Sequence, residues 1–140
     1  MPDWIDNYRE KILEKIGDEE PLLEYALFHD CGKPLCKTID EQGKQHFPNH
    51  AEESYKAWID AGGSEEIGQL IKMDMDIHLL KANGIEEFCK RPQAIQLLLS
   101  GLAEIHSNAN MFGGIDSISF KIKWKNLDRR GSQICKKVFE

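Results

Sequence analysis

The chain carries a group of histidines and carboxylates that could together bind a divalent metal ion. His29 and Asp30 are adjacent, and the other members follow at wider spacing: His46, His50, Asp74, Asp76, His78, Glu104 and His106. Neutral imidazoles combined with carboxylates suit borderline divalent metals such as manganese, iron, nickel, cobalt or zinc. At a helix end that enters a loop, the side chains of His29 and Asp30 can converge on one ion. The sequence therefore predicts a metal site centred on this doublet.

Helical patterns dominate the segments that must position these residues. Apolar residues at helical spacing predict helices over 4–16, from 21 to the doublet, over 51–61, over 64–80, around 85–90 and over 94–106. Pro21 is suited to a first helical turn, and Ser64 is a good N-cap. Residues 31–50 contain glycines, prolines and polar residues without periodicity, which predicts a long loop. Long loops in compact domains are often functional.

The last segment fits two patterns. Residues 118–124 alternate between apolar and polar as a strand does, but an apolar stripe at helical spacing continues to Val138, long after the alternation stops. We interpret the segment as a helix, because a lone edge strand would have no evident partner. With 140 residues, of which 41% are apolar and 30% charged, the chain is predicted to form one compact all-α domain, 1–140, of about six to seven helices.

Composition also indicates where the protein works. No apolar run approaches the roughly 18 residues that span a bilayer, and the first residues are acidic where a signal peptide is basic. We expect a cytoplasmic protein without a membrane partner. The four cysteines are widely spread and are expected to be reduced thiols. The sequence leaves the oligomeric state open.

The net charge of −6 is unevenly distributed along the chain. Residues 1–116 carry 11 basic and 22 acidic side chains, whereas residues 117–140 carry 7 basic and 2 acidic ones. This basic C-terminal segment is either a solvated helix face or a surface that attracts a phosphorylated ligand or RNA.

Two motifs carry a family resemblance. ALFHDCGKP, residues 26–34, resembles the signature of the HD superfamily of helical metal-dependent phosphohydrolases. DEQGKQHFPNHAEES, residues 40–54, is similar to the loop and histidine-bearing helix in the HD domains of bacterial tRNA nucleotidyltransferases and RNA end-healing enzymes. HDxGKP alone is moderately specific, and its combination with HFxxHxxxS is much more so. The resemblance covers residues 22–80 well.

The resemblance implies an all-helical fold of the HD type that holds one or two divalent ions (Mn, Fe, Ni, Co, Zn or Mg) and hydrolyses phosphomonoesters or phosphodiesters. His29 and Asp30 match the doublet, with Asp30 as the bridge if two ions are bound. His50 and His78 match further histidine ligands. Asp74 stands four residues before His78, which would put both on one helix face, where relatives often carry histidine.

The chemistry of such a site assigns roles to individual residues. The metal would lower the pKa of a bound water, direct the hydroxide at phosphorus and neutralise the phosphoryl oxygens. Asp30 and Lys33 are the candidate catalytic residues, because Lys33 follows Asp30 by three positions in a glycine-containing turn and can reach a phosphate held on the metal. Lys37 is a second candidate phosphate-binding residue. The expected substrate is a phosphorylated small molecule, such as a nucleotide, or an RNA end.

The sequence also departs from the family pattern. It has no histidine before His29, so Asp6, Asn7 or Glu10 would have to supply the early ligand. It has no aspartate between Asp76 and Asp116, where His106, or else Glu104, is the nearest substitute for the late ligand. His106 is equally well explained as a packed or surface histidine, and Asp74 as a solvated acid. A second hypothesis is therefore a degenerate HD domain that binds a nucleotide, RNA or protein partner without catalysis.

A structural zinc site is the rival interpretation of the loop. Cys31, Cys36, His46 and His50 form C-x4-C-x9-H-x3-H. A classical zinc finger has about 12 residues between its inner ligands and a helix under its histidine pair. Pro48 interrupts the pair here, and the central spacing is too short. The metal site at the His29-Asp30 doublet is the preferred hypothesis.

Overall fold

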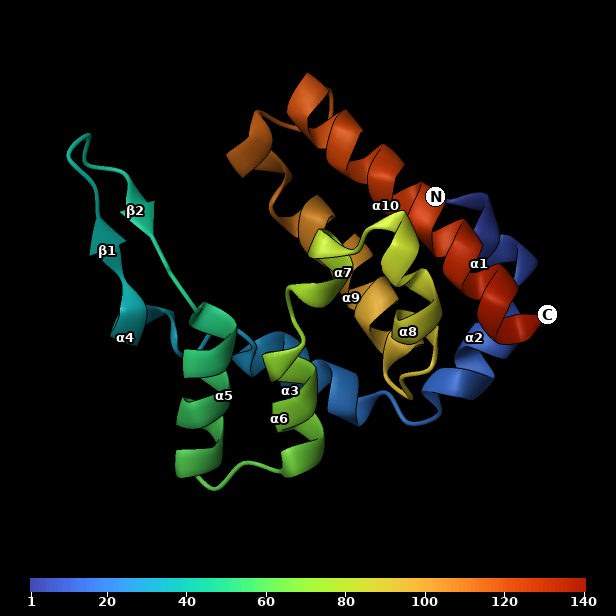
Figure 1. Ribbon diagram of the computed structural model, residues 1–140, viewed down its shortest axis with the longest axis horizontal. Helices are drawn as coiled ribbons and strands as arrows, with labels where there is room; N and C mark the ends of the chain where they lie inside the picture. Colours follow the sequence, from blue (N-terminus) through green and yellow to red (C-terminus); the bar gives the residue numbers. More distant parts are fainter. The chain divides into compact units, whose positions relative to one another are not determined.

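The structure is a computed structural model that describes all 140 residues, and it is largely helical (Figure 1). Its elements are α1 (Asp3–Asn7), α2 (Arg9–Ile16), α3 (Glu20–Phe28), α4 (Lys33–Cys36), β1 (Thr38–Ile39), β2 (Gln45–His46), α5 (His50–Asp60), α6 (Glu65–Lys72), α7 (Asp76–Leu79), the 3-10 turn η1 (Ala82–Gly84), α8 (Ile85–Cys89), α9 (Ala94–Ser107), the 3-10 turn η2 (Ala109–Phe112) and α10 (Ile118–Phe139). Six of the helices have eight or more residues, so the predicted all-α fold class is confirmed. None of them combines the length and the apolar composition that crossing a bilayer requires.

The chain divides into two compact units. The middle unit is Glu19–Met75 and contains α3 to α6 with the short hairpin. The terminal unit joins Met1–Asp18 to Asp76–Glu140 and contains the remaining helices. The expectation of a single domain over 1–140 stays a prediction.

Helix α9 is the centre of the terminal unit. It packs against α10, α7 and α2, while α10 also packs against α8 and α1. The buried side of α9 consists of Ala94, Ile95, Leu97, Leu98, Gly101, Leu102 and Ile105. α10 begins at the N-cap Ser117 and buries Phe120, Leu127 and Ile134 at helical spacing. The predictions of a core helix over 94–106 and of a helix over 118–138 are both confirmed.

In the middle unit, α6 packs against α5 and α3. The N-cap of α6 is Ser64, as predicted, and its hydroxyl accepts a hydrogen bond from the Ile67 backbone N–H at 3.4 Å. Its amphipathic pattern buries Ile67, Leu70 and Ile71. The prediction of an irregular loop over 31–50 was incomplete, because α4 and an antiparallel hairpin lie within it. Asp40 supports the hairpin turn by accepting hydrogen bonds from two backbone N–H groups, each at 2.9 Å. Because such a turn depends on side-chain hydrogen bonds, a search for apolar periodicity does not detect it.

Two predicted helices are each divided. The helix over 4–16 is interrupted at Tyr8, whose φ of −120° and ψ of 17° are not helical. The helix over 64–80 ends at Lys72, and a turn follows in which the Asp74 N–H donates to the Ile71 carbonyl. The prediction that Asp74 and His78 share one helix face is therefore wrong. Asp74 is nevertheless buried, and it follows Ile71 by three positions and Leu70 by four, which is the spacing of the buried face of α6.

Candidate metal centre

The His29-Asp30 doublet lies at the end of α3, as predicted. Pro21 lies in the first turn of this helix, and His29 is its C-cap, with its N–H donating to the Tyr25 carbonyl at 2.8 Å. The chain then turns, and the Asp30 carbonyl accepts the Lys33 N–H at 3.0 Å at the start of α4. The doublet and Lys33 are thus held in one short backbone arch.

Gly32 fastens this arch to α5. Its N–H donates to the hydroxyl of Ser54, a fully buried side chain, at 2.9 Å. A Cβ at position 32 would lie 2.3 Å from the Ser54 backbone nitrogen and 2.4 Å from the Glu53 carbonyl carbon, so only glycine fits. Ser54 is one helical turn after His50 on α5. Because the arch is packed on the backbone of α5, the position of Asp30 relative to His50 is fixed.

Three potential ligand atoms converge beside this contact. They come from Asp30, His50 and Asp74, and they all lie within 4.8 Å of one another. His50 Nε2 is 3.9 Å from Asp30 Oδ1 and 3.5 Å from Asp74 Oδ2. Donors bound at about 2.1 Å to one ion are about 3.0 to 3.4 Å apart, so a small contraction would bring these atoms around a metal.

The Asp74 carboxylate is placed from the interior of the unit. Its side chain is fully buried, and the hydroxyl of the buried Tyr25 donates a hydrogen bond to Oδ1. Tyr25 comes from α3, one helical turn before His29, and the two rings are 5.4 Å apart. One helix therefore both positions Asp74 and delivers the doublet. Tyr25 was not among the predicted site residues, although its spacing of four residues from His29 places both on one face of the helix.

Asp30 has two different oxygen environments. Oδ2 accepts a hydrogen bond from the Lys33 ammonium at 2.6 Å and lies 3.5 Å from His29 Nε2. Oδ1 is buried and has no hydrogen-bond partner. A buried carboxylate oxygen without a partner is costly unless a cation or donor satisfies it. Two carboxylates beside one lysine leave an excess negative charge that suits a divalent cation.

His29 is oriented through its other nitrogen. Its Nδ1 lies 2.9 Å from the Ala26 carbonyl, an acceptor, so the neutral ring carries its proton on Nδ1 and leaves the Nε2 lone pair available. The Lys33 ammonium also lies 5.5 Å from the centre of the Phe47 ring. Lys37, the other predicted phosphate-binding residue, is exposed where α4 leads into the hairpin.

The remaining predicted ligands belong to the terminal unit. His78 Nε2 lies 3.0 Å from a carboxylate oxygen of Glu104, which joins α7 to α9. Gly101 makes room for this contact, since a Cβ there would be 2.7 Å from Ile77. His106 Nδ1 is 2.8 Å from the Leu102 carbonyl, and the ring of this exposed histidine packs edge-on against the buried Phe120. Metal ligation by His78 and His106 stays a prediction.

Of the candidates for the early ligand, Asp6 accepts a hydrogen bond from the exposed Arg9 at 2.5 Å. Its own side chain is 62% exposed. Asp6 therefore belongs to a surface ion pair of the terminal unit.

The cysteines do not form the rival zinc site. The Cys31 thiol donates to the Ser54 carbonyl, the Cys36 thiol to the Lys33 carbonyl, and His46 pairs with Asp40 at 2.8 Å. No cluster of potential metal ligands includes a cysteine. Partial burial also raises the pKa of the Cys31 thiol, which disfavours the thiolate that zinc requires.

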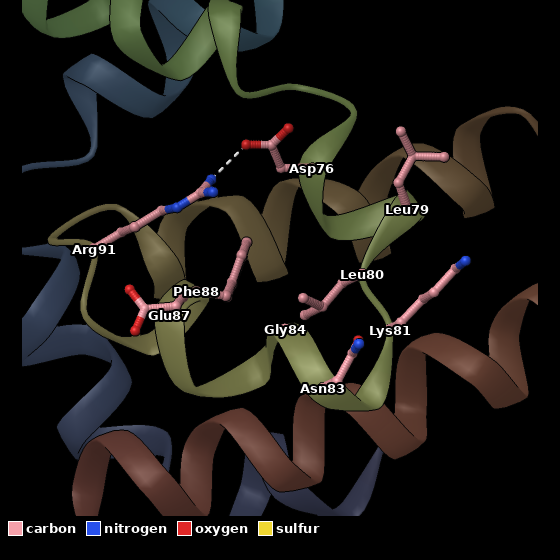
Figure 2. Close-up of a pocket in the computed structure, with 9 residues that line it drawn as sticks. All are labelled: Asp76, Leu79, Leu80, Lys81, Asn83, Gly84, Glu87, Phe88 and Arg91. Atoms are coloured by element: carbon pink, nitrogen blue, oxygen red, sulfur yellow. Dashed lines mark hydrogen bonds and ion pairs between the residues drawn. The ribbon is translucent and has the colours of Figure 1, made fainter.

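A cavity of about 370 Å³ lies in the terminal unit and was not predicted (Figure 2). Its lining combines apolar and charged side chains: Asp76, Leu79, Leu80, Lys81, Asn83, Gly84, Glu87, Phe88 and Arg91. Arg91 lies over the Phe88 ring, 5.4 Å from its centre, and its guanidinium pairs with Asp76. Of the histidines and carboxylates predicted to bind a metal ion, only Asp76 lines this cavity.

Comparison with known proteins identifies no relative: no family model, no curated protein and no solved structure matches the chain.

Proposed function

We propose that the chain is a metal-dependent phosphohydrolase, a phosphomonoesterase or phosphodiesterase, acting on a nucleotide or an RNA-end phosphate. Its metal ligands are Asp30, His50 and Asp74. The observation that carries the proposal is the convergence of these donors from three separate segments at Asp30, whose buried Oδ1 accepts no hydrogen bond.

The three proposed ligand side chains suit the divalent metal ion that the proposal requires. One imidazole nitrogen and two carboxylates suit Mn, Fe, Co, Ni or Zn, and Mg would bind with more water in its shell. A bound divalent ion lowers the pKa of water and offsets charge on phosphoryl oxygens. The fully buried Asp74, held by Tyr25, is the rigid member of the set, and Asp30 is the member that faces solvent. Substrate therefore approaches from the side of Asp30.

Lys33 is the phosphate-binding residue of this proposal. Its side chain is one-third exposed, and its ammonium lies 2.6 Å from Asp30 Oδ2. If a cation takes up the charge of Asp30, the ammonium is released to pair with a substrate phosphate. His29 Nε2, 3.5 Å from the same oxygen, is placed to complete the ligand set or to bind the substrate.

The same ion pair also supports a second candidate function, a degenerate domain that binds a nucleotide, RNA or protein partner without turnover. The Lys33 ammonium already neutralises one oxygen of the carboxylate that would hold the metal. In such a protein the pair is a permanent structural contact, and no ion displaces it.

Metal content and turnover separate the two candidates. Purified protein is analysed for bound transition metals and titrated calorimetrically with Mn²⁺, Co²⁺, Ni²⁺, Zn²⁺ and Mg²⁺. Hydrolysis is then measured on nucleoside monophosphates, cyclic nucleotides and 2′,3′-cyclic phosphates. Asp30→Ala is expected to abolish metal-dependent hydrolysis and to cost more than the roughly 10- to 100-fold in metal affinity that follows loss of an outer hydrogen-bond partner. Lys33→Ala is expected to raise KM mainly, with metal affinity retained.

His46→Ala is the matched control, because it removes a histidine of the same loop that pairs with Asp40 on the exposed hairpin. It should leave metal affinity and turnover unchanged. Absence of metal uptake by the wild-type protein would refute the hydrolase. Uptake of metal without turnover on any of these phosphates would favour the non-catalytic alternative.

A further inference from the structure

Four large apolar side chains are exposed close together in the terminal unit. Met111 is 80% exposed, Ile115 60%, Ile118 78% and Ile122 57%. They occupy η2, the following turn and the start of α10, at the end of α10 that is opposite to the C-terminus (Figure 1). Single exposed apolar residues are ordinary, but a cluster of this kind marks a contact surface.

Cationic side chains adjoin this cluster along α10. Lys121, Lys123, Lys125 and Arg129 are all exposed, and none of them takes part in an ion pair. The Lys123 ammonium instead lies 4.8 Å from the centre of the Phe112 ring. We call residues 111–129 with these side chains the 111–129 surface. The positive charge of this surface favours an anionic partner.

Helical geometry puts both kinds of side chain on one face. The buried residues of α10, among them Phe120 and Leu127, define the side that packs on the unit. Ile118, Ile122 and Lys125 recur at i, i+4 and i+7 on the opposite side, and Arg129 continues the row. The free face of α10 therefore begins apolar and becomes cationic.

In contrast to the expectation of no membrane partner, which rested on the lack of a spanning segment, we propose that the 111–129 surface binds peripherally to a bilayer that contains anionic lipids. The four apolar side chains enter the boundary between headgroups and acyl chains, as on interfacial helices. Lys121, Lys125 and Arg129 reach the anionic headgroups with their charged ends while their stems follow the apolar surface.

The composition of the surface favours a bilayer over the other partners. Nucleic acid would pair with the cations, but it would leave the branched aliphatic side chains in water, since single strands are bound through aromatic stacking and cationic grooves. A two-fold contact with a second copy would place the same cations against one another. A bilayer with anionic headgroups satisfies both the apolar and the cationic side chains.

The test is cosedimentation of the full chain with vesicles of phosphatidylcholine alone or with one-third phosphatidylglycerol, at low and at physiological salt. Binding is expected only with the anionic vesicles and should weaken with salt. The I118D/I122D variant should lose at least tenfold in binding. The K121Q/K125Q/R129Q variant should also lose at least tenfold, since each charge near an anionic surface accounts for about fivefold. L35D/I39D, on the exposed part of the middle unit, is the matched control and should bind as the wild type does.

Other results would overturn the proposal. These are no vesicle binding by the wild type, equal binding to neutral vesicles, or an equal loss in L35D/I39D. Binding to a single-stranded RNA without binding to vesicles would assign the surface to nucleic acid and also refute it. Circular dichroism of each variant checks that α10 remains folded. Asp30→Ala, which is predicted to remove metal-dependent hydrolysis, should bind vesicles normally, so failure of one proposal does not imply failure of the other.

Discussion

The two units of the chain differ in what they bury. The terminal unit buries apolar side chains from α1, α2 and α7 to α10, with Leu98 and Ile134 completely inaccessible. The middle unit contributes only four of the buried apolar side chains, yet it contains both of the buried polar ones, Ser54 and Asp74. Burial of polar groups costs free energy unless they are bonded, so the middle unit is organised around its site rather than around a large core.

Charge follows the same division. The middle unit has 12 acidic and 5 basic side chains, formally −7, whereas the terminal unit has 12 acidic and 13 basic ones, formally +1. An acidic unit that buries a carboxylate attracts cations, and a unit with a basic helix attracts anions. We therefore expect the terminal unit to be a stable apolar scaffold and the middle unit, which contains the proposed metal site, to be less stable.

The largest effect on stability is expected from the core of the terminal unit. Leu98→Ala leaves a cavity under α9 and should lower the free energy of unfolding by about 2 to 5 kcal/mol. Urea denaturation measures the loss, and hydrogen exchange locates it. We expect amide protection to fall across α9 and α10 more than across α5 and α6. An equal fall in all four helices would mean that the chain unfolds as one domain, as the sequence predicts.

Gly32→Ala tests the opposite unit. The added Cβ meets the backbone of α5, which cannot move aside as a flexible side chain does, so the arch that carries Asp30 must shift. We expect a loss of about 1 to 3 kcal/mol in stability, typical of overpacking, together with a more than tenfold loss of metal affinity in a calorimetric titration. Gly101→Ala is the matched control in the terminal unit, where the contact is with the Ile77 side chain. It should lower stability without changing metal affinity, and an equal loss of affinity in both variants would contradict the role assigned to the arch.

Sequence reasoning succeeded where local rules act. Pro21 and Ser64 mark helix starts through their own backbone or side-chain chemistry, and both do so in the structure. The segment that forms α10 was predicted correctly as a helix. Its apolar residues recur at helical spacing over all 22 residues and can bury one continuous face, whereas the strand-like alternation covers only its first few residues.

The features that the sequence did not predict depend on contacts between residues that are far apart in the chain. The spacing of Asp74 from Leu70 and Ile71 continues the buried face of α6, but nothing local indicates that its partner is the Tyr25 hydroxyl, 49 residues away in the sequence. The hydrogen bond between Gly32 and Ser54 also joins residues far apart in the sequence. Both residues belong to the motifs HDxGKP and HFxxHxxxS, but the motifs alone do not predict that they are in contact. The motif residues Asp30 and His50 do lie together, but the third ligand-capable side chain beside them was predicted on the wrong element.

Smaller effects are expected from the two serine N-caps, one in each unit. Ser117→Ala should lower stability by about 1 kcal/mol, within the usual range of about 0.5 to 2 for a lost cap, because its hydroxyl accepts the Phe120 N–H at 3.1 Å. Ser64→Ala should cost less, because the corresponding bond to the Ile67 N–H is 3.4 Å. Thermal denaturation of both variants ranks them. A larger loss for Ser64→Ala would show that the middle unit depends more on its local bonds than on packing.

The smallest perturbation is a thiol-labelling experiment that leaves the fold unchanged. Burial, with a smaller contribution from the neighbouring Cys89, raises the pKa of the Cys135 thiol to about 12. At pH 8 only about one molecule in ten thousand carries the Cys135 thiolate, which is the form that reacts with iodoacetamide. Cys31 of the middle unit is exposed, and its pKa is also raised, mainly by partial burial. Mass spectrometry of native protein at pH 8 should therefore find Cys31 alkylated well before Cys135. In 6 M urea the two rates should become equal, because unfolding removes the burial that separates them. Equal alkylation rates for Cys31 and Cys135 in the native protein would mean that Cys135 on α10 is as accessible as an exposed thiol. That result would contradict the claim that the terminal unit is the more stable of the two units.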